Sequence, residues 1–216
     1  MPRIALIHAL AFSAAPINDA LARDWPQAER MNLLDDSLSS DLARAGRLDA
    51  AMTRRFEQLA DYAVDNGANA VLFTCSAFGP CIDAVKLRLR AIPVLKPNEA
   101  MVDEAVAMAR RLGGPIGLVA SFAPTLASMP AEFPADTVLY SALAEGALAA
   151  LERGDTAAHD AAVVRAASSL VAQGCVAIAL AQFSLARAAP RVASACGLTV
   201  LTTVDSAVRR LRELLS

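Results

Sequence analysis

Residues 71–80 read Val71-Leu72-Phe73-Thr74-Cys75-Ser76-Ala77-Phe78-Gly79-Pro80. The apolar start of this stretch follows the turn residues Gly67 and Asn69, a pattern that predicts a buried strand. Pro80 suits the first turn of a helix, because its missing N–H would have no partner there. Cys75 is therefore expected at the carboxyl end of a strand, which is the edge where ligands bind in open parallel α/β sheets.

Cys75 is the candidate reacting group of this stretch. The N-terminus of the helix that follows favours a thiolate, so the sequence predicts that Cys75 ionises below the free value of about 8.5. Packing is the alternative role, because free cysteine is among the residue types most often buried. Cys81, Cys175 and Cys196 are interpreted as packing residues, since they fall inside a predicted helix, at a strand start and at a helix end.

Composition limits the classes of protein to which the chain can belong. Its 216 residues are 56% hydrophobic, so it can bury a substantial core. No apolar run approaches the ~18 residues of a membrane span, and the amino terminus enters a strand pattern directly, so a cytoplasmic location is expected. The four cysteines and two histidines lack the spacing of metal ligands. A net charge of -2 argues against a nucleic-acid partner, whereas the alanine-rich composition is compatible with a homo-oligomer.

Strand and helix patterns alternate along the whole chain. Strands are predicted at residues 4–9, 31–34, 71–73, 92–95, 116–120, 138–141, 175–181 and 198–202. Among the helices predicted between them, one covers residues 143–153, and Asp49 is expected to be the N-cap of a long amphipathic helix. This alternation predicts an α/β fold with mostly parallel sheets flanked by helices.

The two halves of the chain repeat one another around a break at Gly113-Gly114-Pro115. In each half a long helix leads to an apolar strand and then to a polar triplet, which is Thr74-Cys75-Ser76 or Gln182-Phe183-Ser184. The pattern predicts two pseudo-symmetric lobes with the active-site cleft between them. The expected domains are an N-terminal lobe at residues 1–97, a C-terminal lobe at residues 98–203, and a closing helix at residues 204–216 that packs back on the N-terminal lobe.

Polar groups at the predicted strand ends are the candidate ligand-binding groups. His8 is a candidate base, although a histidine at the end of a buried strand is more often a hydrogen-bonded core residue. Lys96 would suit a carboxylate ligand. The remaining candidate contacts to a substrate or its oxyanion are Ser13, Thr74, Ser76, Ala77, Ser121, Thr125, Gln182, Phe183 and Ser184. Preorganised donors aimed at developing charge are worth ~2.7–4 kcal/mol each, but serine and threonine at strand ends are also ordinary helix caps.

These residues resemble the aspartate/glutamate racemase superfamily, which includes hydantoin racemases, maleate isomerases and arylmalonate decarboxylases. The resemblance covers nearly the whole chain and rests on residues 71–79, on Leu180-Ala181-Gln182-Phe183-Ser184, and on the gap between the two stretches. It implies two α/β lobes, a cleft between them, no cofactor, and a small carboxylate substrate. It also implies abstraction of a proton alpha to the carboxylate by a thiolate on each face.

One position departs from the racemase pattern. Gln182, or Phe183 if the register shifts by one residue, stands where the racemases have their second cysteine, and neither side chain can accept a proton. Two-base racemisation is therefore in doubt. The resemblance implies a cofactor-independent racemase- or isomerase-like enzyme with Cys75 as the single catalytic cysteine and Gln182 as the other catalytic position. The alternatives are a decarboxylase of a malonate-like acid, a cysteine hydrolase with His8 as its base, and a non-catalytic carboxylate-binding protein.

Overall fold

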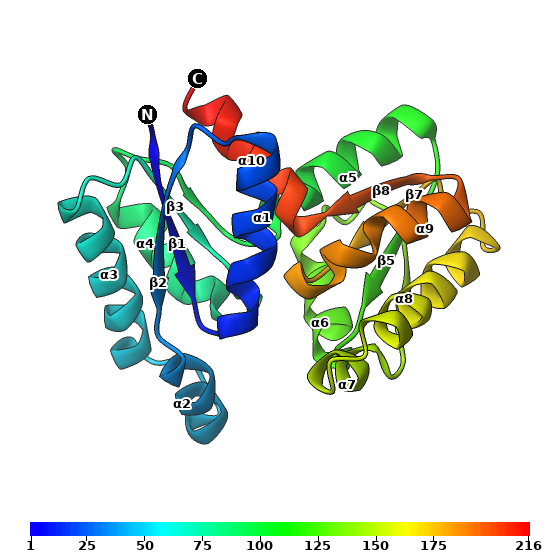
Figure 1. The fold of residues 1–216 in the computed structure, drawn as a ribbon, viewed down its shortest axis with the longest axis horizontal. Helices are drawn as coiled ribbons and strands as arrows, with labels where there is room; N and C mark the ends of the chain where they lie inside the picture. The colour runs from blue at the N-terminus through cyan, green and yellow to red at the C-terminus, as the bar shows by residue number, and fades with distance from the viewer. The chain divides into compact units, whose positions relative to one another are not determined.

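The structure is a computed structural model that describes residues 1–216, except for the side chain of Phe12. The chain forms two compact units. Unit 1 contains Met1–Pro97 together with Ala207–Ser216, and unit 2 contains Asn98–Ser206. Each unit is built around a four-stranded parallel sheet with flanking helices, which confirms the predicted α/β fold class (Figure 1).

Unit 1 is organised around sheet A, in which the strands lie in the order β2-β1-β3-β4. The strands are β1 Arg3–His8, β2 Glu29–Leu34, β3 Ala70–Phe73 and β4 Val94–Leu95. The helices are α1 Ala14–Asp24, α2 Ser37–Ala45, α3 Ala50–Asp65 and α4 Gly79–Arg88, with the 3-10 helices η1 Ala11–Ser13 and η2 Ser76–Phe78. α10 Thr203–Leu214 begins in unit 2, and its residues from Ala207 onward belong to unit 1.

The two faces of sheet A carry alternate residues of each strand. Ile7, Val71 and Phe73 point to the face covered by α3 and α4, where they share a core with Phe56 and Ile82. Figure 1 shows α3 and α4 on this side of the sheet and α1 on the other. Because the side chains of a strand alternate between the faces, neighbouring residues at a strand end have different surroundings.

Unit 2 is organised around sheet B, in which the strands lie in the order β6-β5-β7-β8. The strands are β5 Ile116–Ala120, β6 Leu139–Leu143, β7 Ala177–Leu180 and β8 Thr199–Thr202. The helices are α5 Glu99–Leu112, α6 Ala123–Ser128, α7 Ala147–Glu152, α8 Thr156–Val171 and α9 Ala189–Cys196, with the 3-10 helices η3 Met129–Glu132 and η4 Phe183–Ala188.

The core of unit 2 also lies on both faces of its sheet. Val119, Ile178 and Leu180 pack with α8 and α9, whereas Leu118 and other alternate residues pack with α5. Gly117 is the second residue of β5, where a Cβ atom would come within 2.8 Å of Ile178 and 3.0 Å of Leu170. Glycine at this position therefore allows α8 to approach the sheet closely.

Several element boundaries differ from those predicted, most clearly around β6. The strand expected at residues 138–141 continues to Leu143, and the helix expected at 143–153 begins only at Ala147. β6 pairs with β5 as far as Ala120 and Leu143, and Gly146 then turns the chain at a φ of 77°. Strand pairing with β5 therefore outweighs the helical spacing of the apolar residues that follow.

Candidate functional site

Cys75 stands at the carboxyl end of β3, as the sequence predicted. The register of β1 and β3 ends with Ile7 beside Phe73, so the next two positions place His8 beside Thr74 and Ala9 beside Cys75. Cys75 has extended backbone (φ -128°, ψ 118°) and is the N-cap of η2, which continues into α4. The strand, the thiol and the following helices thus lie in the order expected of a strand-end site.

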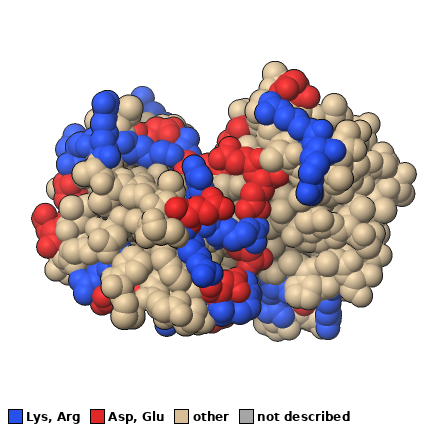
Figure 2. All heavy atoms as spheres, turned by 90° about the horizontal axis from the view of Figure 1, so that it is seen from above, with Lys and Arg blue, Asp and Glu red and all other residues tan. Residues whose placement is uncertain are grey.

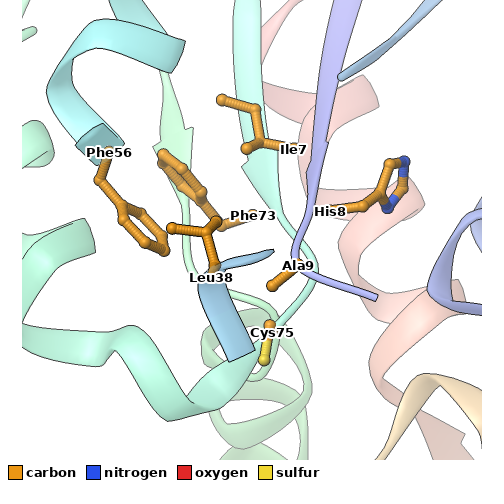
Figure 3. A pocket seen from close by; sticks show the side chains of 7 residues that line it. All are labelled: Ile7, His8, Ala9, Leu38, Phe56, Phe73 and Cys75. Atoms are coloured by element: carbon orange, nitrogen blue, oxygen red, sulfur yellow. The ribbon is translucent and has the colours of Figure 1, made fainter. Parts of the chain in front are cut away.

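The thiol of Cys75 is half-buried among apolar side chains. It lines a shallow, partly open pocket together with Ile7, His8, Ala9, Leu38, Phe56 and Phe73 (Figure 3). Burial raises the pKa of Cys75, and a hydrogen bond from the backbone N–H of Ala77 opposes that rise. The prediction of a lowered pKa was therefore wrong, because desolvation in this apolar setting outweighs the donors at the helix start.

His8 is buried, and both of its ring nitrogens are hydrogen-bonded. Nδ1 lies 2.9 Å from Oγ1 of Thr74, and Nε2 lies 2.9 Å from Oδ1 of Asn32. Burial lowers the pKa of His8, and the bond to Asn32 opposes this shift. Figure 3 shows the imidazole pointing away from Cys75, on the other side of β1. His8 therefore lacks the contact with Cys75 that a cysteine hydrolase requires, and the hypothesis that it is the base for this thiol is not supported.

Asn32 is a member of this network that the sequence analysis missed. Its Oδ1 accepts a hydrogen bond of 2.8 Å from the side-chain nitrogen of Asn18, which identifies this atom as the amide oxygen. An amide oxygen can only accept, so Nε2 of His8 carries the proton that it donates to Asn32. In the neutral ring Nδ1 is then an acceptor, and the hydroxyl of Thr74 donates to it. The signal available in the sequence was an asparagine inside the apolar run of residues 31–34.

The remaining candidates in unit 1 are more dispersed. Ser76 and Ala77 are exposed in η2, directly after Cys75, and Ser13 ends η1 in the connection after β1. Lys96 follows β4, where its Nζ lies 2.7 Å from a carboxylate oxygen of Asp83 on α4. The positive charge that was predicted to face a carboxylate ligand is therefore already paired with a carboxylate of its own unit.

In unit 2 the structure brings together Ser121 and Gln182. Ser121 follows β5 and Gln182 follows β7, and Oε1 of Gln182 accepts hydrogen bonds from the backbone N–H of Ser121 at 2.7 Å and from its Oγ at 3.0 Å. Phe183, which is buried, and Ser184 are the first residues of η4. Thr125 is buried on α6, in the segment that follows Ser121.

Gln182 occupies the same place in unit 2 as Cys75 occupies in unit 1. Each lies two residues beyond the last registered pair of its central strands, Ile7 with Phe73 and Val119 with Leu180. Each has extended backbone and is the N-cap of a 3-10 helix that continues into an α-helix with proline in its first turn. The internal duplication thus pairs a thiol with an amide.

The residues that the structure describes form neither a metal cluster nor a membrane-spanning helix. Among the residues that the structure describes, no group of three or more His, Cys, Asp or Glu side chains is arranged to hold a metal ion. Within the same residues, every helix is too short or too polar to cross a membrane. Acidic and basic side chains are interspersed on the face shown in Figure 2, so that face carries no extended field of one sign.

Comparisons with solved structures show the same fold. An aspartate racemase homologue from Pyrococcus horikoshii matches with a TM-score of 0.72 at 13% identity, covering 99% of this chain and 99% of the other. A glutamate racemase from Bacillus anthracis gives 0.70 at 13% identity, covering 99% and 81%. Unliganded arylmalonate decarboxylase gives 0.66 at 14% identity, covering 99% and 93%.

Comparison by sequence extends this result. A search of curated protein sequences gave no match. A sequence model of the family described as Asp/Glu/Hydantoin racemase matches residues 15–211, which include both strand ends with Cys75 and Gln182. The matched region covers most of both units, and its fold is that of racemases of known structure. The chain therefore belongs to the Asp/Glu/hydantoin racemase family.

Proposed function

We propose that this protein is a cofactor-independent racemase- or isomerase-like enzyme that acts at the carbon alpha to a carboxylate or carbonyl of a small acid, with Cys75 as its single reacting thiol. The observation that carries the proposal is the strand-end position of Cys75, whose counterpart in the repeat is the amide of Gln182. Membership of the racemase family supports the reaction class. An amide cannot accept a proton at neutral pH, so proton transfer falls to one thiol.

A single thiol limits the stereochemical outcome. The thiolate of Cys75 would take the alpha proton, the electron pair of the broken C–H bond would pass into an enolate, and the same thiol would return a proton to carbon. The N–H of Ala77 would stabilise the thiolate during this step, as its hydrogen bond to Cys75 favours the charged form. Removal and return on one face exchange the proton without inverting the centre.

Deuterium exchange tests this proposal. The protein would be incubated in deuterated water with a panel of small amino, hydroxy and dicarboxylic acids, and label at the alpha carbon would be measured by mass spectrometry. We expect exchange with at least one acid, its loss in Cys75→Ser, and its retention in Cys196→Ser, a matched control because Cys196 is also half-buried. The proposal fails if no acid exchanges while a glutamate racemase exchanges glutamate under the same conditions.

Decarboxylation of a malonate-like acid is a second candidate function, because it needs only one proton donor. The C–C bond to one carboxylate would break, carbon dioxide would leave, and the thiol of Cys75 would protonate the resulting enolate before water restored the thiol. The raised pKa of Cys75 suits a thiol that is protonated before the reaction. Release of carbon dioxide from substituted malonates, lost in Cys75→Ser, would favour this function over exchange without decarboxylation.

A further inference from the structure

Ser121 fixes the orientation of the Gln182 amide. Oε1 of Gln182 accepts the backbone N–H of Ser121 at 2.7 Å and the side-chain hydroxyl at 3.0 Å. A backbone N–H can only donate, so the oxygen of the amide, and not its nitrogen, must face Ser121. These two hydrogen bonds hold the amide with its oxygen toward Ser121. Gln182 lies beside Ser121 because of the register of the central strands β5 and β7.

The nitrogen of Gln182 is the free end of this amide. It carries two hydrogens and has no acceptor capacity. Among the residues that the structure describes, none accepts a hydrogen bond from Nε2, and the side chain of Gln182 is only partly buried. Toward a bound molecule the residue can therefore act as a donor, while its own acceptor is occupied by Ser121.

We propose that Gln182, positioned by Ser121, is a fixed hydrogen-bond donor that selects ligands presenting a carboxylate or enolate oxygen. This inference rests on the proposed function for the class of ligand, and it narrows that class. An ammonium group only donates, so at this point it would meet another donor and gain no hydrogen bond. A small dicarboxylate presents an acceptor to Gln182 from either of its ends, whereas an amino acid with an ammonium in place of one carboxylate does so from one end only, so the dicarboxylate is favoured.

Malonate and glycine form a matched pair of probes, because glycine carries an ammonium where malonate has its second carboxylate. Their binding would be measured by isothermal titration calorimetry with the wild-type protein and with Gln182→Glu. This variant keeps an oxygen for Ser121 and replaces the donor NH2 group by an anionic oxygen. We expect wild type to bind malonate more tightly than glycine, and Gln182→Glu to bind malonate about tenfold or more weakly.

The control for the added charge is Gln173→Glu in the same unit, at an exposed side chain that bonds to the carbonyl of Ser169. It should bind malonate as wild type does. The unfolding temperature of Gln182→Glu without ligand should remain at the wild-type value, since Ser121 keeps its acceptor. A merely structural role for Gln182 would leave malonate affinity unchanged in Gln182→Glu, which would overturn the proposal.

Further variants separate this inference from the proposed thiol chemistry. Ser121→Ala keeps the backbone donor but loses the hydroxyl, so it should weaken malonate binding less than Gln182→Glu does; it also serves if Gln182→Glu does not fold. Malonate should still bind to Cys75→Ser. If malonate binding depends on Gln182 and no acid exchanges deuterium, the inference stands and the proposed function fails. If deuterium exchange depends on Cys75 but wild type does not bind malonate, or binds it no more tightly than Gln182→Glu does, the proposed function stands and the inference about Gln182 fails.

Discussion

At the residue level, the reactivity of Cys75 is set by opposing local effects. Burial raises the pKa of the thiol, and the hydrogen bond from Ala77 lowers it by less. We expect the rate of alkylation by iodoacetamide to rise with pH with a midpoint above the value of about 8.5 for a free cysteine. Peptide mass spectrometry would follow modification of Cys75 in the native protein and in urea, where the midpoint should return to about 8.5. A native midpoint below that of the unfolded protein would contradict this prediction.

His8 makes stability depend on pH because burial lowers its pKa. Between that lowered pKa and the ordinary value of about 6.5, the unfolded chain binds a proton that the native protein does not, so stability falls as the pH falls through this window. His8→Gln should cost about 1–3 kcal/mol at pH 7.5, since Thr74 and Asn32 lose their hydrogen bonds to the buried imidazole. Urea unfolding at the two pH values should show that the free energies of unfolding of wild type and His8→Gln differ less at pH 5.5 than at pH 7.5. The same difference at both pH values would argue against a lowered pKa of His8.

At the level of elements, close packing between β5 and α8 depends on Gly117. Gly117→Ala should lower the free energy of unfolding by about 1–3 kcal/mol, because the added methyl group meets Ile178 and Leu170 in a filled core. Gly79→Ala is the control: this glycine has helical backbone and no atom within 4 Å of an added Cβ, so the substitution should stabilise by about 0.4–1 kcal/mol. Urea unfolding curves would measure both variants. If Gly117→Ala and Gly79→Ala changed the free energy of unfolding equally, β5 would be shown to tolerate the added methyl group.

Features that depend on local chemistry were predictable from the sequence, and those that depend on pairing were not. Asp49 does cap α3, accepting a bond of 2.8 Å from the N–H of Met52, as its position before an amphipathic run predicted. The end of β6 at Leu143 was not predictable, because it is set by pairing with β5 rather than by its own residues. In the candidate site, the strand-end position of Cys75 follows from local pattern. The bond of Gln182 to Ser121 and that of His8 to Asn32 join residues far apart in sequence.

For the molecule as a whole, the repeated sheet order leads to a prediction about gained function. The racemase resemblance implies one thiol in each half, and unit 2 has Gln182 at the position that corresponds to Cys75. Gln182→Cys should therefore add proton exchange with inversion of the alpha carbon to the exchange seen in wild type. Chiral chromatography of a substrate found in the deuterium screen would measure inversion. Its absence in a folded variant that retains exchange would show that the second position takes no part in proton transfer.

The discontinuous composition of unit 1 has a consequence for how the protein is made. Residues 207–216 belong to unit 1, where Arg212 of α10 donates a hydrogen bond of 3.3 Å to the carbonyl of Asp24 at the end of α1. Unit 2 is continuous in sequence and lies between the two segments of unit 1. On the ribosome, all of unit 2 is therefore translated before the last segment of unit 1. Unit 1, which carries Cys75, can therefore acquire its last segment only after the whole of unit 2 has been made.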